Sequence, residues 1–467
     1  MIMKRPLSLI AVLVLCISVC FAGQRPKYIF MFIGDGLGIN HVYGTELYNA
    51  AVHPEKPNGG KMSFYNFPIR TYVTNYSSST LVTDSSAAAT ALAAGVKTVN
   101  GYMGVDSDKR SVKNITELVS ELGMKVGVVT NVGMNHATPS AFYAHHESRS
   151  AYKSLYEQYL TSEVDFAAGA TILLKKKDGL KFEDYVAKAK AAGIDVVHDL
   201  DKAANVVGKR VLLLPENPQS KTLKYANDCK PGDWTIVDYT DSAIKYLERE
   251  AKRDGFFLMV EAGHMDYCAH DNDAVTTFEE VNHLSDSVAK ALEFYNRHPK
   301  ETLIIVTADH ETGGLSLGYT NYKMNMERLA WQNGSVSSLT RKMQRFRDDG
   351  KSSWEDMKVL LTRELGFWEG VRLRKKDEQQ LRKTFEKSFI ENSDKVVSLY
   401  SVNEKMASTA IEILNKRAYI KWISLNHTGM QVPLYIKGAG IEHLTECYDN
   451  TDVPKGIARA LGKKLAE

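Results

Sequence analysis

The chain has 467 residues, of which 44% are hydrophobic and 25% are charged, and its formal net charge is +3. This composition is typical of a globular protein with one large domain or two to three average ones. The near-neutral charge argues against a partner such as nucleic acid or an anionic membrane surface.

The amino-terminal 22 residues have the pattern of a secretory signal peptide. Lys4 and Arg5 precede an apolar run that starts at Leu7 and ends in "VCFAG". The run is shorter than the ~20 residues that a membrane-spanning helix needs. A lipid anchor on Cys20 is an alternative, although the preceding "ISV" lacks the small residue expected there. We therefore expect an exported protein, periplasmic or extracellular, with no transmembrane anchor and a catalytic domain over residues 23–467.

Four apolar runs of strand type each end in a loop rich in Gly, Asp, His or Thr. They are "YIFMFIGDGLG" from Tyr28, "KVGVVTNVGMNHATP" from Lys125, "GFFLMVEAGHMDYCAHDND" from Gly255 and "TLIIVTADHETGG" from Thr302. Such continuous runs indicate strands of a parallel sheet that is buried on both faces. Helical patterns at Val112–Leu122, Tyr239–Asp254 and Ala274–His298 supply the crossovers. The predicted fold is therefore α/β, with a large, mostly parallel sheet flanked by helices on both faces.

The stretch "LVTDSSAAATALAAG", residues 81–95, predicts a helix of small residues that ends at Gly95. It opens on Thr83, Asp84, Ser85 and Ser86. Such residues are favoured as helix N-caps. The oxygens of such caps accept hydrogen bonds from the free backbone amides of the first helical turn. These amides and the positive end of the helix dipole also suit a phosphate. The stretch alone leaves open whether its serines are caps or include a nucleophile.

A long segment from Tyr319 to about Asn403 carries charged helical patterns such as "SSWEDMKVLLTREL". No strand-loop pattern of the preceding kind occurs in it. We expect a helical insertion at about 319–403 that covers or flanks the site.

Carboxylates and imidazoles follow the predicted strands. The candidates are Asp35, Glu261, Asp266, His270, Asp309, His310 and His427. Asp266 and His270 are four residues apart, so a helix would place both on one face. Zinc binds imidazole nitrogen and carboxylate oxygen, whereas magnesium prefers oxygen. These residues suffice for two sites of mixed nitrogen and oxygen ligands and one mainly oxygen site, and paired metal ions catalyse phosphoryl displacement.

Six motifs of this sequence together resemble those of the alkaline phosphatase family, both in their order along the chain and in their sequence context. They are "GDGLG", "VTDSSAAATALAAGVKTVNG", "NHATPSAFYAHHESR", "VEAGHMDYCAH", "TADHETGG" and "HTG". The resemblance extends from about Tyr28 to Gly429, with no motif in Tyr319–Asn403. It implies the alkaline phosphatase fold, hydrolysis of small-molecule phosphate monoesters and, by family alone, a homodimer.

The resemblance also implies three metal sites. The implied ligands are Asp266, His270 and His427 for a first Zn²⁺, Asp35, Asp309 and His310 for a second, and Asp35, Thr138 and Glu261 for a third, usually Mg²⁺. At His136, beside the third site, many bacterial members carry Asp. Because an imidazole stands at this position, the third ion could be either Mg²⁺ or Zn²⁺.

The catalytic groups implied by the resemblance are Ser85 and Arg149. Ser85 matches the serine that becomes phosphorylated and that also contacts the second zinc, and Arg149 can bind two phosphate oxygens with its planar fork. Asp84 is expected to orient the helix start and Arg149. Tyr267 occupies a position where other members often place Lys or His, so it is a candidate substrate-side residue.

Three cysteines follow the signal peptide, Cys229, Cys268 and Cys447, so at most one disulfide can form among them. Cys268 is interpreted as a packed thiol. Whether Cys229 and Cys447 are joined is left open by the sequence.

Other functions remain as alternatives to a phosphomonoesterase. A sulfatase or phosphodiesterase of the same superfamily is the nearest, but "TDSSAAAT" is not the sulfatase context and Arg149 favours a monoester. An inactive metal- or phosphate-binding protein is disfavoured because the expected ligands and the serine are all present.

Overall fold

The computed structural model describes residues 25–218, 220–320, 322–350 and 353–465. The expected signal peptide and the alternative lipid anchor at Cys20 lie outside these residues. Within the described part of the chain, no helix has the length and apolar character that crossing a membrane requires.

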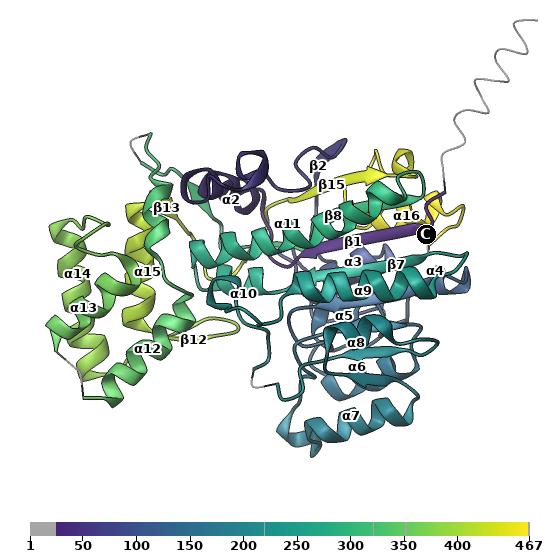
Figure 1. Ribbon diagram of the computed structural model, residues 1–467, viewed down its shortest axis with the longest axis horizontal. Helices are drawn as coiled ribbons and strands as arrows, with labels where there is room; N and C mark the ends of the chain where they lie inside the picture. The colour runs from purple at the N-terminus through teal and green to yellow at the C-terminus, as the bar shows by residue number, and fades with distance from the viewer. Residues whose placement is uncertain (1–24, 219, 321, 351–352, 466–467) are drawn as a thin grey trace, which may run out of the picture.

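A nine-stranded sheet forms the centre of the molecule (Figure 1). Its strands, in spatial order, are β2 (Ile69–Val73), β15 (Val432–Gly438), β8 (Thr302–Ala308), β1 (Tyr28–Gly34), β7 (Phe256–Ala262), β3 (Lys125–Thr130), β4 (Phe166–Ala168), β6 (Val211–Leu213) and β5 (Asp195–Val197). Strand β15 runs antiparallel to both of its neighbours, and every other pairing in this sheet is parallel. The predicted, mostly parallel sheet is confirmed.

The four apolar runs found in the sequence become the central strands β8, β1, β7 and β3. Every residue of β1, β7 and β8 is buried. This burial on both faces explains why these strands are continuously apolar.

Helices cover both faces of the sheet. Those of the main body are α2 (Ile39–Val52), α3 (Ser85–Ala94), α4 (Ile115–Glu121), α5 (Ala137–Ser140), α6 (Tyr152–Thr161), α7 (Phe182–Ala191), α8 (Leu200–Asn205), α9 (Ile236–Glu250), α10 (His264–His270), α11 (Ala274–Arg297) and α16 (Asp452–Ala460). Figure 1 shows α9 and α11 in front of the sheet and α3 and α5 behind it. Both predicted long crossover helices, α9 and α11, are present close to their expected ranges.

A helical lobe lies at one end of the molecule, away from the sheet (Figure 1, left). It contains α12 (Val336–Asp348), α13 (Trp354–Leu365), α14 (Lys375–Phe385), α15 (Lys405–Arg417) and the hairpin of β11 (Lys395–Val397) and β12 (Val402–Glu404). Its buried apolar cluster continues through α15 to Trp422 and reaches Phe278 of α11. The lobe therefore ends later than the charged patterns indicated, because α15 packs an apolar face into the same core.

Two short two-residue pairings complete the strands. They are formed by β9 (Glu311–Thr312) with β14 (His427–Thr428), and by β10 (Ser316–Leu317) with β13 (Ile420–Lys421), alongside the hairpin of the lobe. Cys229, Cys268 and Cys447 are free thiols, so none of these three is joined to another. Cys268 is buried, and its Sγ accepts a hydrogen bond from Thr277 Oγ1 (3.3 Å), as expected of a packed thiol.

Candidate active site

The register of the central strands brings three carboxylates together. Gly34, the last residue of β1, pairs with Ala262 on one side and Ala308 on the other. Asp35 therefore leaves the sheet beside Asp309, while Glu261 pairs with Ile33, two residues before Asp35. All three side chains are completely buried. At Gly36, where φ is +77°, an added Cβ would lie 2.9 Å from the backbone of Asp266, so the loop after β1 passes directly against α10.

Three groups of side chains in this region could each hold a metal ion. They are Asp266 with His310 and His427, Asp35 with His136 and Glu261, and Asp35 with Asp309 and His310. Within each group one donor atom per residue lies within 4.8 Å of the others. Asp35 and His310 each belong to two groups, so the three candidate sites are contiguous.

The donor atoms are buried but unpaired. Among the described residues no hydrogen-bond partner is found for Oδ1 and Oδ2 of Asp35, Oε1 of Glu261, Oδ2 of Asp266, Oδ2 of Asp309, Oγ1 of Thr138, Nδ1 of His136, or Nε2 of His270 and His427. Leaving so many polar atoms unsatisfied is costly, and bound cations would satisfy them. The donor set of imidazole nitrogen and carboxylate oxygen therefore fits metal ions.

Two of the imidazoles are oriented by backbone carbonyls. Nδ1 of His270 donates to the Leu425 carbonyl (2.5 Å), and Nδ1 of His427 donates to the Thr83 carbonyl (2.9 Å). A proton on Nδ1 leaves the lone pair of Nε2 free, as a metal ligand requires. The carbonyls thus fix both the tautomer and the direction of each ring.

Strand pairing brings His427 to the site from more than 100 residues away. Its strand β14 pairs with β9, which follows Asp309 and His310 directly. The rings of His310 and His427 stack with their centroids 3.5 Å apart. Glu311 supports this arrangement, because its carboxylate accepts hydrogen bonds from the Gly314 amide (2.9 Å) and from Thr428 Oγ1.

The two serines at the start of α3 have different hydrogen-bond partners. Asp84 is the N-cap, and its Oδ1 accepts a hydrogen bond from the Ala87 amide (3.0 Å). Ser86 Oγ donates to Asp84 Oδ2 (2.7 Å) and accepts from the Gly101 amide (3.1 Å). Ser85 Oγ instead lies 3.2 Å from Nε2 of His310. Ser86 thus belongs to the cap, while Ser85 faces the candidate metal ligands.

Arg149 lies between the helix start and the lobe. Its Nη1 donates to Asp84 Oδ2 (2.9 Å), and its Nη2 donates to the hydroxyl of Tyr400 (3.3 Å). Burial alone would raise the pKa of Asp84, but the charge of Arg149 and the hydrogen bond from Ser86 hold it below its usual value. Asp84 therefore contacts both the first turn of α3 and the guanidinium of Arg149.

Tyr400 is a site residue that the sequence did not indicate. It stacks on Tyr267, with ring centroids 3.8 Å apart and planes 13° apart. It lies in the turn between β11 and β12, and this turn is fixed because Asp271, directly after α10, accepts hydrogen bonds from Ser398 (2.7 Å) and Ser401 (2.5 Å). A charged segment without a motif offered no signal for a contact of this kind.

The buried carboxylates have strongly shifted pKa values in the absence of a cation. Burial and the charge of Asp309 raise the pKa of Asp35 well above its usual value. Burial and the charge of Asp266 raise the pKa of Asp309 to about 8, and burial raises that of Glu261 to about 7. Burial would also raise the pKa of Asp266, but the imidazoles of His270, His427 and His310 together outweigh it and keep the pKa low.

His136 is uncharged in this setting, since burial and the nearby Arg149 lower its pKa to about 3. It is the N-cap residue of α5, the helix that carries Thr138. A neutral imidazole is a competent metal ligand, so the third group combines two carboxylates with a nitrogen donor.

The structure places the expected ligands close to one another. Asp35, Asp309 and His310 form one of the three groups, and the group around Asp266 and His427 has His310 as its third member. His270 lies close by, with Nε2 3.3 Å from Asp266 Oδ2.

Comparison with known proteins gives consistent results. A family model described as alkaline phosphatase matches residues 26–463. Alkaline phosphatase 4 of Bacillus subtilis strain 168 is 30% identical over 442 residues, covering 93% of this chain and 88% of that protein. Alkaline phosphatase 3 of the same strain is 29% identical over 443 residues, covering 93% and 89%.

Solved structures show the same fold. A cold-active alkaline phosphatase from a psychrophilic Shewanella species superposes with a TM-score of 0.77 at 25% identity, covering 93% of this chain and 99% of that one. The alkaline phosphatase of Thermus thermophilus superposes with a TM-score of 0.73 at 24% identity, covering 94% of this chain and 92% of that one.

The raised pKa values predict how the stability of the cation-free protein changes with pH. In the folded chain, Glu261 retains its proton up to about pH 7 and Asp309 up to about pH 8. In the unfolded chain, they lose their protons near their usual pKa values, 4.5 for Glu261 and 3.8 for Asp309. The folded state thus binds more protons, so its stability falls as pH rises from about 5 to 8, by at most ~1.4 kcal/mol per pH unit for each group. Thermal melting of chelator-treated protein across this range measures the slope. Saturating Zn²⁺ should abolish the decline, and a melting temperature that rises with pH in the cation-free sample would contradict the assignment.

The Tyr400→Phe variant tests the contact between the lobe and Arg149. It removes the hydroxyl that accepts from Arg149 and keeps the ring that stacks on Tyr267, so affinity for inorganic phosphate should fall about two- to fivefold. Isothermal calorimetry on the metal-loaded protein provides the measurement. Tyr322→Phe, at an exposed tyrosine outside the site, is the matched control and should bind like the parent. Equal affinities for both variants would refute the contact's role.

Proposed function

The chain belongs to the alkaline phosphatase family, whose members are metal-dependent phosphomonoesterases, and we propose that it hydrolyses phosphate monoesters through a phosphoserine on Ser85. One observation carries this proposal. The Ser85 hydroxyl, 3.2 Å from Nε2 of His310, lies beside the unsatisfied donor atoms of the candidate metal sites. The Ser86 hydroxyl is engaged on both sides in the helix cap.

We assign the metal sites by donor type. Asp266, His270 and His427 would hold one Zn²⁺, and Asp35, Asp309 and His310 a second. Asp35, Thr138 and Glu261 would hold the third ion, Mg²⁺ or, because His136 adds a nitrogen donor, Zn²⁺. When bound, such ions lower the pKa of a serine hydroxyl and stabilise negative charge on the leaving oxygen.

The residues of the chain would then act in two displacements. In the first, Ser85 Oγ gives up its proton to solvent and forms a bond to phosphorus, and the bond from phosphorus to the alcohol oxygen breaks. The alcohol oxygen takes up a proton from solvent, and the alcohol leaves. In the second, water adds to phosphorus, the bond to Ser85 breaks, and inorganic phosphate leaves. The serine hydroxyl is thereby restored.

Arg149 would bind the equatorial phosphate oxygens during both displacements. Its guanidinium is held by Asp84, so the donors are oriented before the substrate arrives. The free amides at the start of α3 add further donors toward the same anion. Such preorganised donors stabilise the charge that develops on a transferring phosphoryl group.

We further propose that the protein is exported after loss of residues 1–22 and acts in the periplasm or outside the cell as a homodimer. The amino-terminal basic and apolar pattern supports export. The homodimer rests on the family resemblance.

Replacing each serine separately tests the nucleophile. Ser85→Ala should abolish both turnover and the covalent phosphoenzyme, because no oxygen is left to attack phosphorus. Ser86→Ala should retain most of the activity and lose about 1 kcal/mol of stability through the weakened cap. Acid quenching with radiolabelled substrate followed by peptide mapping detects the phosphoserine. Label on Ser86 would show that the assignment is wrong by one residue.

Metal removal tests the dependence on cations with two readouts. Chelation should abolish hydrolysis of p-nitrophenyl phosphate and lower the melting temperature by several degrees, because the stabilisation that bound cations give to the folded state is then lost. Adding Zn²⁺ and Mg²⁺ back should restore both. Turnover that survives complete chelation, verified by elemental analysis, would rule out the metal-dependent mechanism.

A further inference from the structure

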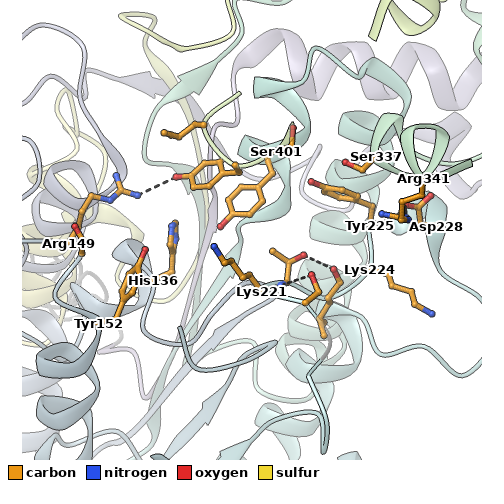
Figure 2. A pocket seen from close by; sticks show the side chains of 17 residues that line it. His136, Arg149, Tyr152, Lys221, Lys224, Tyr225, Asp228, Ser337, Arg341 and Ser401 are labelled. Atoms are coloured by element: carbon orange, nitrogen blue, oxygen red, sulfur yellow. Dashed lines mark hydrogen bonds and ion pairs between the residues drawn. The ribbon is translucent and has the colours of Figure 1, made fainter. Parts of the chain in front are cut away.

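A cavity of about 1010 Å³ opens beside Arg149 (Figure 2). The segment around Lys221 and Tyr225, the turn that carries Tyr400, and the side of α12 that carries Arg341 all contribute to its walls. Its volume is at the upper end of the range for small-molecule pockets. Residues of both the lobe and the main body line it.

The cavity is continuous with the candidate active site. Arg149, His136, Tyr267 and Tyr400 line it, and each of them belongs to the site or contacts a residue of the site. A phosphate ester held by Arg149 therefore has this cavity next to it as space for the rest of the molecule.

The cavity has a positive excess that its own acidic groups do not cancel. Besides Arg149, the basic residues that line it are Lys221, Lys224 and Arg341, and within the described chain Asp228 is the one carboxylate in its wall. Asp228 accepts hydrogen bonds from the amide (2.8 Å) and hydroxyl (2.6 Å) of Ser335, at the start of α12. Its contact with Arg341 is long, at 3.6 Å.

The two lysines differ in how they are paired. Lys224 donates from Nζ to both carboxylate oxygens of Asp233 (2.7 and 2.8 Å), so its charge is neutralised. Lys221 has no carboxylate within ion-pair distance among the described residues. Figure 2 shows Lys221 extending through the middle of the cavity, between His136 and the end that Arg341 occupies. Lys221 is exposed to the solvent of the cavity, and an unpaired ammonium in a concave place favours an anion there.

We propose that this cavity is a second anion-binding subsite, in which Lys221 binds a second phosphate of the substrate, so that the preferred substrates are small bisphosphorylated molecules. The inference rests on the proposed function, because the first phosphate must be held at Arg149. Arg341, at the far end, adds a longer-range attraction for the same group.

Butane-1,4-diol bisphosphate and its monophosphate provide a matched pair of probes. The bisphosphate is symmetric, so its two phosphates give only a twofold statistical advantage. Initial phosphate release by the metal-loaded mature protein gives kcat/KM for each. The parent protein should prefer the bisphosphate about tenfold beyond the statistical factor, mainly through a lower KM, and 0.5 M NaCl should reduce this preference because screening weakens it.

Three variants locate the effect. Lys221→Gln should reduce the ratio of the two kcat/KM values to about the statistical factor, and Lys221→Arg should retain most of the preference. Lys202→Gln on α8, which removes the same charge from an exposed place outside the cavity, should leave the ratio unchanged. Because the readout is a ratio within one protein, a general loss of activity does not imitate the result.

Two outcomes overturn the inference. A parent protein without preference for the bisphosphate excludes a second anion subsite, and a Lys221→Gln variant that keeps the preference excludes Lys221 as its ligand. In both cases hydrolysis of the monophosphate still supports the proposed function. If the metal-loaded protein hydrolyses neither probe nor p-nitrophenyl phosphate, the proposed function fails and the inference fails with it.

Discussion

The repulsion among four buried carboxylates is the constraint on which the rest of the structure depends. Asp35, Glu261, Asp266 and Asp309 are all completely buried, and parallel strand register forces three of them into adjacent positions. No folded chain tolerates such a cluster as free anions in a site with little water. The surrounding structure is organised to keep these groups in place for cations: carbonyls hold the imidazoles, a tight glycine turn brings α10 against the loop after β1, and a helix start supplies further positive potential.

The sequence predicted the parts of the site that follow directly from strand ends. The runs before Asp35, Glu261 and Asp309 are apolar on both faces because their strands are central, and a polar residue at the end of such a run is conspicuous. The i and i+4 spacing of Asp266 and His270 was also readable, since α10 forms as expected. The family resemblance then selected Ser85 over Ser86, a choice that helix-capping physics alone could not make.

The contributions of the lobe could not be predicted in the same way. Tyr400 approaches Arg149 across 251 residues of sequence, in a turn whose position depends on Asp271 and two serines of the hairpin. Lys221 is an exposed residue of an irregular segment, and its local sequence gives no sign that it lines a cavity. The charge and periodicity of a sequence describe one segment at a time, whereas the positions of Tyr400 and Lys221 depend on how the lobe packs against the main body. The end of the lobe at Trp422 was missed for the same reason, because α15 joins the core of the lobe through an apolar face.

The attachment of the lobe has a consequence for substitutions in its helices. A short turn, residues 398–401, carries Tyr400 to Arg149, while the candidate metal ligands lie outside the lobe, on the sheet, on the loops that follow it and on α10. Substitutions in the helices of the lobe can therefore change the wall of the cavity without moving a ligand. The candidate metal ligands and the part of the cavity wall that the lobe supplies are thus encoded in separate parts of the chain.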